Sequence, residues 1–405
     1  MSTPLIRRIR LRNYKSIAAC DVTLGQLMFL VGPNGAGKSS FLDAMRFVAD
    51  GLRTSMDLAL RERGGIKEVR RRSGGHPNHF NIRLDFSLPS GQAGHYAFRV
   101  GSQAAGGYEV QNEECSIASA HVLGGTHHFH VKSGRVVATS LSTPPSALSD
   151  GLYLVRVSGT EEFRPVVDAL SQIEIYNLNP RVIAAMQPPD SGALLRRDGS
   201  NAASVLQHLP ADARLRVTEH LSRIVPGVTD VKPKVLGTQE TIEFFQAMKG
   251  QRHPWSFLAG SMSDGTLRAF GVLLAVFQAA GSVPGKKPPL LIGLEEPEMA
   301  LHPAAAAVLL AALREASRSC QILVTSHSPE LLDNADIHAD SIIAVENQDG
   351  ITAVGSLDQA NVGILRDKLF TAGELLRQNQ LAADEGTLRD VVNERQLAMF
   401  EHEGR

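Results

Sequence analysis

A glycine-rich segment, GPNGAGKS at residues 32–39, restricts the folds open to this chain more than any other part of its sequence. It follows the apolar run LMFLV at residues 27–31, and after it Phe41, Leu42 and Met45 recur at helical spacing. The segment matches the pattern GxxxxGK[ST], in which backbone N–H groups and the N-terminus of the following helix surround phosphate oxygens. The sequence therefore predicts a strand, a phosphate-binding loop and a helix, and with them an α/β fold.

The positions of this loop have expected roles. Lys38 is expected to reach the β- and γ-phosphates of ATP, and the Ser39 hydroxyl to bind Mg²⁺. Glycine is needed because a Cβ atom would obstruct the approach of the backbone to the phosphates. The predicted nucleotide-binding residues are Gly32, Asn34, Gly35, Gly37, Lys38, Ser39 and Ser40.

Hydrolysis needs acidic groups beside such a loop, and the segment LLIGLEEPE supplies them. The apolar run at residues 290–294 predicts a buried strand that ends at Glu295 and Glu296, where ligands of open α/β sheets collect. We expect Glu295 to hold the metal and Glu296 to polarise the attacking water. The next predicted strand, 321–325, ends at TSHS, so His327 should lie at the same edge and contact the γ-phosphate.

The segment SMSDGT precedes a strongly apolar predicted helix at residues 266–280. One interpretation is a helix cap, in which Ser263 or Asp264 accepts from free N–H groups. The other is a second anion site formed by Ser263, Asp264 and Gly265 at the helix N-terminus. A single chain does not need two such sites for one nucleotide, whereas a dimer does.

Composition limits the remaining possibilities. The chain has 405 residues, 43% of them hydrophobic, and a formal net charge of −1, so we expect a globular protein without a global charge footprint for nucleic acid. Its three cysteines are far apart, which argues against a disulfide framework. The sequence shows no signal peptide and no membrane span, and we expect a cytoplasmic protein.

Together these segments resemble an ABC-type ATPase head of the SMC-like, RecF-like and OLD-like group. The resemblance rests on IRRIRLRNYKSI, VGPNGAGKSSFLDAM, SMSDGT, LEEPEMALHP and ILVTSHSPELLD. It implies a head-to-tail homodimer that encloses two ATP molecules, with Ser263 and Gly265 reaching the partner's nucleotide. It also implies that Leu301 and His302 lie in the loop crossing this interface and that Asn13 and Lys15 lie by the nucleotide.

The expected fold class is α/β, an ABC-type P-loop head with a mostly parallel core sheet, an antiparallel β subdomain and a helical signature lobe. Five parts are expected: an ATPase part with the loop at 1–48, a basic segment and antiparallel meander at 49–150, a helical lobe with the signature at 151–285, a second ATPase part at 286–355, and a charged helical tail at 356–405 that docks partners.

The sequence also departs from the family pattern. Glu295 replaces a more usual aspartate, and Gln187 is one candidate for the glutamine loop. We expect neither the long coiled coil of SMC proteins nor the Toprim half of OLD nucleases. The closing segment LRDKLFTAGELLRQNQL resembles the tail of stand-alone bacterial AAA-type ATPases, whose genes often lie beside a nuclease-like partner.

The predicted function is a Mg²⁺-dependent ATPase that acts as an ATP-gated dimeric switch in phage defence or DNA repair, with a separate effector. The alternatives are the ATPase subunit of a transporter and a nucleotide-bound scaffold that does not hydrolyse. Residues 53–72 hold seven Arg or Lys against three acidic residues. This segment is either a solvated basic face or a sequence-independent contact to a nucleic-acid backbone.

Overall fold

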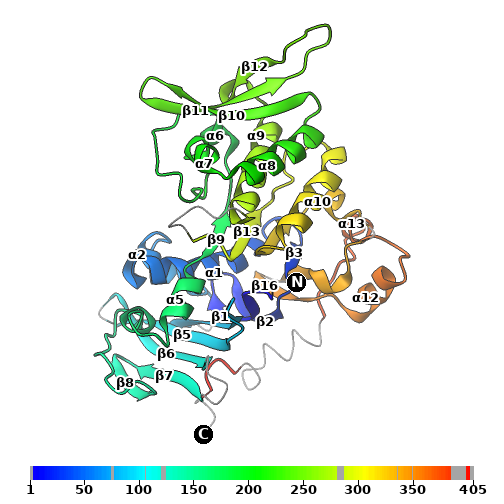
Figure 1. Ribbon diagram of the computed structural model, residues 1–405. Coiled ribbons are helices and arrows are strands. Elements are labelled where there is room, and N and C mark those ends of the chain that lie inside the picture. The colour runs from blue at the N-terminus through cyan, green and yellow to red at the C-terminus, as the bar shows by residue number, and fades with distance from the viewer. Residues whose placement is uncertain are drawn as a thin grey trace. The chain divides into compact units, whose positions relative to one another are not determined.

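The computed structural model describes residues 3–73, 77–104, 106–119, 125–280, 287–334, 336–348, 350–384 and 398–401 (Figure 1). Within these residues the fold is mixed α/β, as the sequence predicts, and the chain forms two compact units. The first unit comprises Met1–Ile173, His338–Asp367 and Asn379–Arg405, and the second comprises Glu174–Ile337 and Lys368–Gln378.

The first unit is built on a mixed sheet with the strand order β8, β7, β6, β5, β4, β1, β2, β16, β15, β3. β3 runs parallel to β15, and β16 meets β2 in parallel, whereas the pairs from β2 out to β8 are antiparallel. The strands are β1 (Ile6–Tyr14), β2 (Ile17–Thr23), β3 (Leu27–Val31), β4 (His79–Ser87), β5 (Ala93–Ser102), β6 (Tyr108–Ala118), β7 (Thr126–Lys132), β8 (Arg135–Thr139), β15 (Ile342–Gln348) and β16 (Ile351–Ser356).

Helix α1 (Lys38–Arg53) buries one face on this sheet through aromatic side chains. The Phe47 ring lies 5.4 Å from Phe80 and 6.1 Å from Tyr14, both in edge-to-face geometry, which aromatic quadrupoles favour. Aromatic contacts therefore fix the helix that follows the glycine loop. The other helices of this unit are α2 (Met56–Arg61), α3 (Ile66–Val69), α4 (Tyr153–Arg156), α5 (Arg164–Leu170) and α12 (Gln359–Arg366).

The second unit contains the parallel pair β13 (Leu291–Glu295) and β14 (Gln321–Ser326), with β9 (Ile173–Tyr176) beside β13. A separate antiparallel sheet consists of β10 (Val228–Leu236), β11 (Gln239–Gln246) and β12 (Trp255–Leu258), drawn in green in Figure 1. The helices are α6 (Pro180–Ala184), α7 (Ala202–His208), α8 (Ala211–Ile224), α9 (Asp264–Phe277), α10 (Ala306–Ala316), α11 (Pro329–Leu332) and α13 (Ala372–Arg377).

Helix α9 is apolar on nearly all sides because it forms the core of the second unit. It packs against α6, α7, α8 and α10, and its Phe270 ring meets Phe244 of β11 at 5.6 Å. A helix that is hydrophobic all round is expected to be buried, and α9 follows this rule from Thr266 to Phe277 apart from Arg268. Arg268, the polar exception, lies one turn into the helix and close in sequence to the signature segment.

Several predicted elements agree with the structure. The strand predicted at 27–31 is β3, the meander predicted from 79 to about 140 consists of β4 to β8, and the apolar helix begins at Asp264 rather than at 266. Strands β10, β11 and β12 were not predicted, because their alternation is interrupted by charged residues and by Pro233. Of the tail at 356–405, residues 385–397 and 402–405 lie outside the described part.

Two further expectations concern the whole chain. Among the described residues, no helix combines the length and the apolar character that a bilayer crossing requires. The three cysteines, Cys20, Cys115 and Cys320, are unpaired and buried.

Candidate functional site

The glycine loop lies in the first unit, between β3 and α1, as predicted. A Cβ atom on Gly32 would lie 1.9 Å from the carbonyl oxygen of Val345 on β15, so only glycine fits between these two parallel strands. Gly37 has φ 110°, and a Cβ atom there would lie 2.3 Å from Oγ1 of Thr352. Both glycines are therefore required by the neighbouring strands, independently of any phosphate.

Lys38 is the first residue of α1, and its side chain turns back over the loop. Its Nζ donates to the carbonyl oxygens of Gly32 at 2.8 Å and Pro33 at 3.0 Å, and the residue is only 5% exposed. Helix α1 has no side-chain cap at its N-terminus, so its first N–H groups face the loop, beside exposed Ser39. The ammonium group and the positive end of the helix dipole therefore belong to the same loop, an arrangement that suits an anion.

A residue from the C-terminal part of the chain, Thr352, contacts the backbone of the loop. Oγ1 of Thr352 on β16 donates to the carbonyl oxygen of Ala36 at 2.8 Å and lies 2.8 Å from Oγ of Ser16. Ser16 in turn lies 3.4 Å from Oγ of Ser40 in the first turn of α1. A chain of hydroxyl groups thus links β16, the β1–β2 turn and the loop, and the sequence analysis did not identify Thr352.

Asn13 near the end of β1 and Lys15 in the β1–β2 turn are the residues for which the resemblance implies a place by the nucleotide. Both have positive φ, at 55° and 49°. Nζ of Lys15 lies 2.6 Å from Oδ2 of Asp43 on α1, and Arg63 donates to both Asp43 oxygens at 3.0 Å. Burial raises the pKa of Asp43, but Arg63 and Lys15 outweigh it and hold this pKa below its usual value. The ion pair of Lys15 with Asp43 thus anchors the turn to α1.

The predicted acidic pair and His327 lie in the second unit, at the carboxyl ends of β13 and β14. Glu295 pairs in register with Thr325, and the N–H of Glu296 donates to the carbonyl oxygen of Thr325 at 3.1 Å. Nδ1 of His327 lies 3.0 Å from Oε1 of Glu296, although the two are not aligned as a hydrogen bond. The structure therefore brings Glu296 and His327 together at one edge of the sheet, as the sequence predicts.

Glu296 also has an unusual backbone conformation. Its φ of 45° is in the left-handed region, which an L-residue with a side chain adopts at a cost of about 1–3 kcal/mol. The hydrogen bonds from its N–H to the Thr325 carbonyl and hydroxyl oxygens hold this conformation. The fold thus retains a strained residue at the position predicted to polarise water.

A buried carboxylate that the sequence analysis did not select lies beside this pair. Oγ of Ser326 donates to Oε1 of Glu298 at 2.6 Å, while Oε2 of Glu298 and Nε of Arg268 are buried without a hydrogen-bond partner. Burial raises the pKa of Glu298. Burial also lowers the pKa of Arg268, although the negative charges of Glu296 and Glu298 act to raise it. The sequence feature that could have identified Glu298 is the motif LEEPE, in which Glu298 is the third acidic residue and follows Glu296 by two positions.

The signature segment forms the start of α9. Oγ of Ser263 accepts from the N–H of Thr266 at 3.3 Å, so Ser263 is the helix cap that one of the two interpretations expects, and Asp264 is the first helical residue. A Cβ atom on Gly265 would lie 2.3 Å from the carbonyl oxygen of Ala300, whose own φ is 63°. The helix start therefore touches the loop that carries Leu301 and His302.

Two other candidates have structural partners. The buried side chain of Gln187 donates to the Gly199 carbonyl at 3.2 Å and accepts from the N–H of Ala203 at 3.0 Å, so it is engaged within the second unit. In the basic segment 53–72, five arginines have partners inside the chain: Arg53, Arg61, Arg63, Arg70 and Arg72. Arg61, Arg63 and Arg72 pair with carboxylates, which reduces the positive charge that the segment can offer to a nucleic acid.

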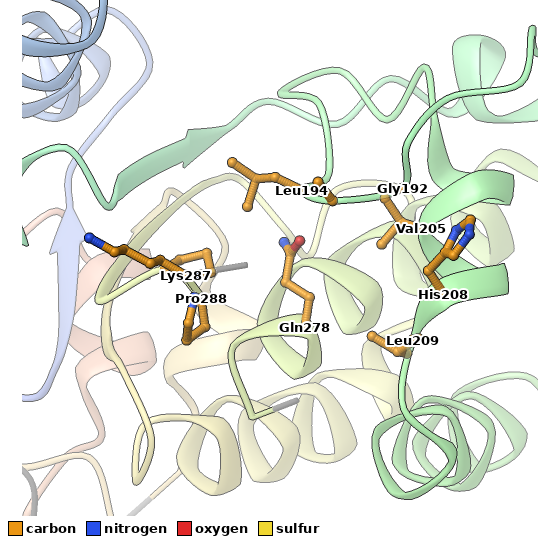
Figure 2. A pocket seen from close by; sticks show the side chains of 10 residues that line it. Gly192, Leu194, Val205, His208, Leu209, Gln278, Lys287 and Pro288 are labelled. Carbon is orange, nitrogen blue, oxygen red and sulfur yellow. The ribbon is translucent and has the colours of Figure 1, made fainter. Parts of the chain in front are cut away.

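A small pocket in the second unit is unrelated to these residues (Figure 2). Its volume is about 20 Å³, enough for a single water molecule and far below the size of a nucleotide site. Figure 2 shows the Gln278 side chain below Leu194, and the Oε1 atom of Gln278 accepts from the N–H of Leu195 at 3.0 Å. We therefore assign no ligand to this pocket.

Comparisons with known proteins concern the fold and the class of ATPase domain. A family model described as "AAA ATPase domain" matches residues 5–89, and one described as "AAA domain, putative AbiEii toxin, Type IV TA system" matches residues 208–333. No curated protein matches the chain.

Two solved structures share the fold at low sequence identity. One is an Smc head bound to the C-winged helix domain of ScpA, with a TM-score of 0.55 and 16% identity over 89% of this chain and 99% of that chain. The other is an Smc head with an extended coiled coil bound to the C-terminal domain of ScpA from Pyrococcus furiosus, with a TM-score of 0.54 and 13% identity over 90% and 99%. The chain thus has the fold of an Smc head, and two parts of it match models of AAA-type ATPase domains.

Proposed function

We propose that the chain is a Mg²⁺-dependent ATPase that works as an ATP-gated dimeric switch. The observation that carries this proposal is the pairing of strained Glu296 with His327 at 3.0 Å, in a chain that also holds Lys38 over a phosphate loop. A protein that only binds nucleotide does not need a carboxylate and an imidazole held together at adjacent strand ends.

Each site residue has a proposed role. Residues 32–40 bind the phosphates of ATP, with Lys38 on the β- and γ-phosphates, and Ser39 with Glu295 holds Mg²⁺. Glu296 accepts a proton from the attacking water, while His327 donates a hydrogen bond toward the γ-phosphate. Ser39 and Glu295 would provide the oxygen donors that Mg²⁺ prefers, and the bound ion would neutralise phosphate charge.

Phosphate release measured on three variants tests hydrolysis. Glu296→Gln should lower turnover at least 100-fold, because general base catalysis typically contributes about 10²–10⁴, while ATP binding stays within about threefold of wild type. Lys38→Ala should weaken ATP binding itself. Glu219→Gln, which changes an exposed carboxylate on α8, is the matched control. Unchanged turnover in Glu296→Gln would favour the non-hydrolysing scaffold.

The signature residues Ser263, Asp264 and Gly265 are proposed to contact the nucleotide bound by a second copy. Light scattering of Glu296→Gln with and without Mg·ATP should show the mass doubling with ATP. Adding Ser263→Arg should prevent this doubling, whereas Ser142→Arg, in an exposed loop, should not. A mass independent of ATP in all three proteins would refute the gated dimer.

The biological role we propose is phage defence or DNA repair, with a separate nuclease-like effector. Support comes from the tail resemblance and from the family description that mentions a Type IV TA system. Contact of residues 53–72 with a nucleic-acid backbone remains a prediction, tested by salt-dependent DNA binding of Arg71→Ala. Co-purification with a membrane protein would instead support the transporter alternative.

A further inference from the structure

The last described residues of the chain, 398–401, lie on the antiparallel meander of the first unit. Met399 and Phe400 are 2% and 3% exposed, and they pack on Ala97 of β5 and Ala19 of β2. The main chain is held as well, because Nη1 of Arg83 donates to the Met399 carbonyl at 3.2 Å. This short segment is therefore bound through both its side chains and its backbone.

The receiving surface is a row of residues across three neighbouring strands. Arg83 on β4 pairs in register with Ala97 on β5, which pairs with Glu114 on β6. Ala97 is the smallest of the three, so it leaves a notch between two long polar side chains. Met399 and Phe400 lie against this notch.

The polar groups around the notch match the bound segment. The carboxylate of Glu114 accepts from the N–H of Glu401 at 3.0 Å and from Nε2 of His95 at 2.9 Å. Burial raises the pKa of Glu114, yet these hydrogen bonds and the charge of Arg83 keep it below its ordinary value. Buried charges are costly unless they are paired, and the Glu401 N–H provides part of this pairing.

Two further contacts explain which side chains the surface accepts. The guanidinium of Arg99 lies 5.3 Å from the centre of the Phe400 ring, a cation–π distance that favours an aromatic residue. The Glu401 carboxylate lies 3.4 Å from Nδ1 of His95 and 3.8 Å from Nη2 of Arg83, which favours an acidic residue at this position. The surface thus fits the order apolar, aromatic, acidic.

We propose that the row Arg83, Ala97 and Glu114, with His95 and Arg99, is a peptide-recognition site, which we call the meander site. Its occupant is the chain's own Met399–Glu401, which acts as a removable strap. When the strap leaves, the site accepts the same segment added as a separate peptide. The proposal is independent of ATP hydrolysis.

Fluorescence anisotropy with a labelled peptide of residues 396–405 tests the meander site in the full-length protein. The double variant Met399→Asp/Phe400→Asp opens the site without changing the sheet, and it should bind this peptide at least tenfold more tightly than wild type. A peptide with alanine in place of Phe400 should bind at least tenfold more weakly. The matched control is Leu369→Asp/Phe370→Asp, an apolar pair in the second unit that is 67% and 43% exposed; it should bind the peptide no better than wild type.

Equal binding by the double variant and wild type, or no binding by a folded double variant, would overturn the proposal. Should the double variant fail to fold, hydrogen exchange of the Glu401 amide gives a second test. This amide should exchange at least tenfold faster in Phe400→Ala than in wild type, because it loses its bond to Glu114. An amide that already exchanges freely in wild type would show that the strap is not bound.

Discussion

Replacing Thr352 by valine should uncouple the phosphate loop from β16. Valine has nearly the shape of threonine but lacks the hydroxyl, so the change leaves packing beneath Gly37 and removes the 2.8 Å hydrogen bond to the Ala36 carbonyl. Thr352 is 1% exposed, so water cannot replace the lost donor. An unsatisfied buried carbonyl costs about 1–3 kcal/mol.

The cost of the unsatisfied carbonyl must lower either the free energy of unfolding or the affinity for nucleotide. If the loop keeps its conformation without nucleotide, the free energy of unfolding falls by the whole amount. If the loop relaxes, ATP affinity falls instead, by about 5- to 150-fold for the same energy. Denaturant unfolding and titration with a fluorescent ATP analogue measure the two terms. Thr352→Ser, which keeps the hydroxyl, should bind ATP as wild type does; a valine variant equal to wild type in both assays would refute the argument.

Other predictions concern both units. Gly265→Ala should lower the unfolding free energy by about 1–3 kcal/mol in denaturant melts, because the new Cβ would meet the Ala300 carbonyl at 2.3 Å. Burial raises the pKa of Glu113 from 4.5 to about 7, so native Glu113 keeps a proton that the unfolded chain releases, and stability should fall as pH rises between these values. Melts at pH 5 and pH 8 should show this loss, up to about 3 kcal/mol, shrinking in Glu113→Gln. Glu296→Gly should abolish phosphate release yet leave the thermal midpoint equal or higher, since glycine relieves the positive φ; a lower midpoint would contradict this.

The sequence predicted the parts of the site that follow local rules. The loop at 32–39 requires only a strand, glycines and a helix that are contiguous in the chain, and β3 and α1 form as that pattern indicates. Glu296 and His327 could be placed together because parallel strands joined by a helix bring their carboxyl ends to one edge. Chain direction and hydrophobic pattern were sufficient in both cases.

The contacts that hold these parts in place could not be predicted in the same way. Thr352 and Ala36 are 316 positions apart, and no local pattern distinguishes Thr352 from any other threonine in a strand. Arg83 and Met399 are likewise 316 positions apart, so the strap was expected only as part of a charged tail. Pairings between distant segments depend on strand order, and the sequence alone did not determine that order.

Seven described residues other than glycine have positive φ, and four of them lie in segments assigned to the site. Asn13, Lys15, Glu296 and Ala300 have positive φ without being glycine, and all four lie in segments assigned to the site by motif or resemblance. Each conformation costs about 1–3 kcal/mol and persists only where surrounding contacts over-determine it. Those contacts are present: Lys15 has its ion pair with Asp43, and the Glu296 N–H bonds to Thr325. Glycine would remove the strain at Glu296 only by removing the carboxylate, so Glu296→Gly separates the cost of the backbone conformation from the proposed role of the side chain.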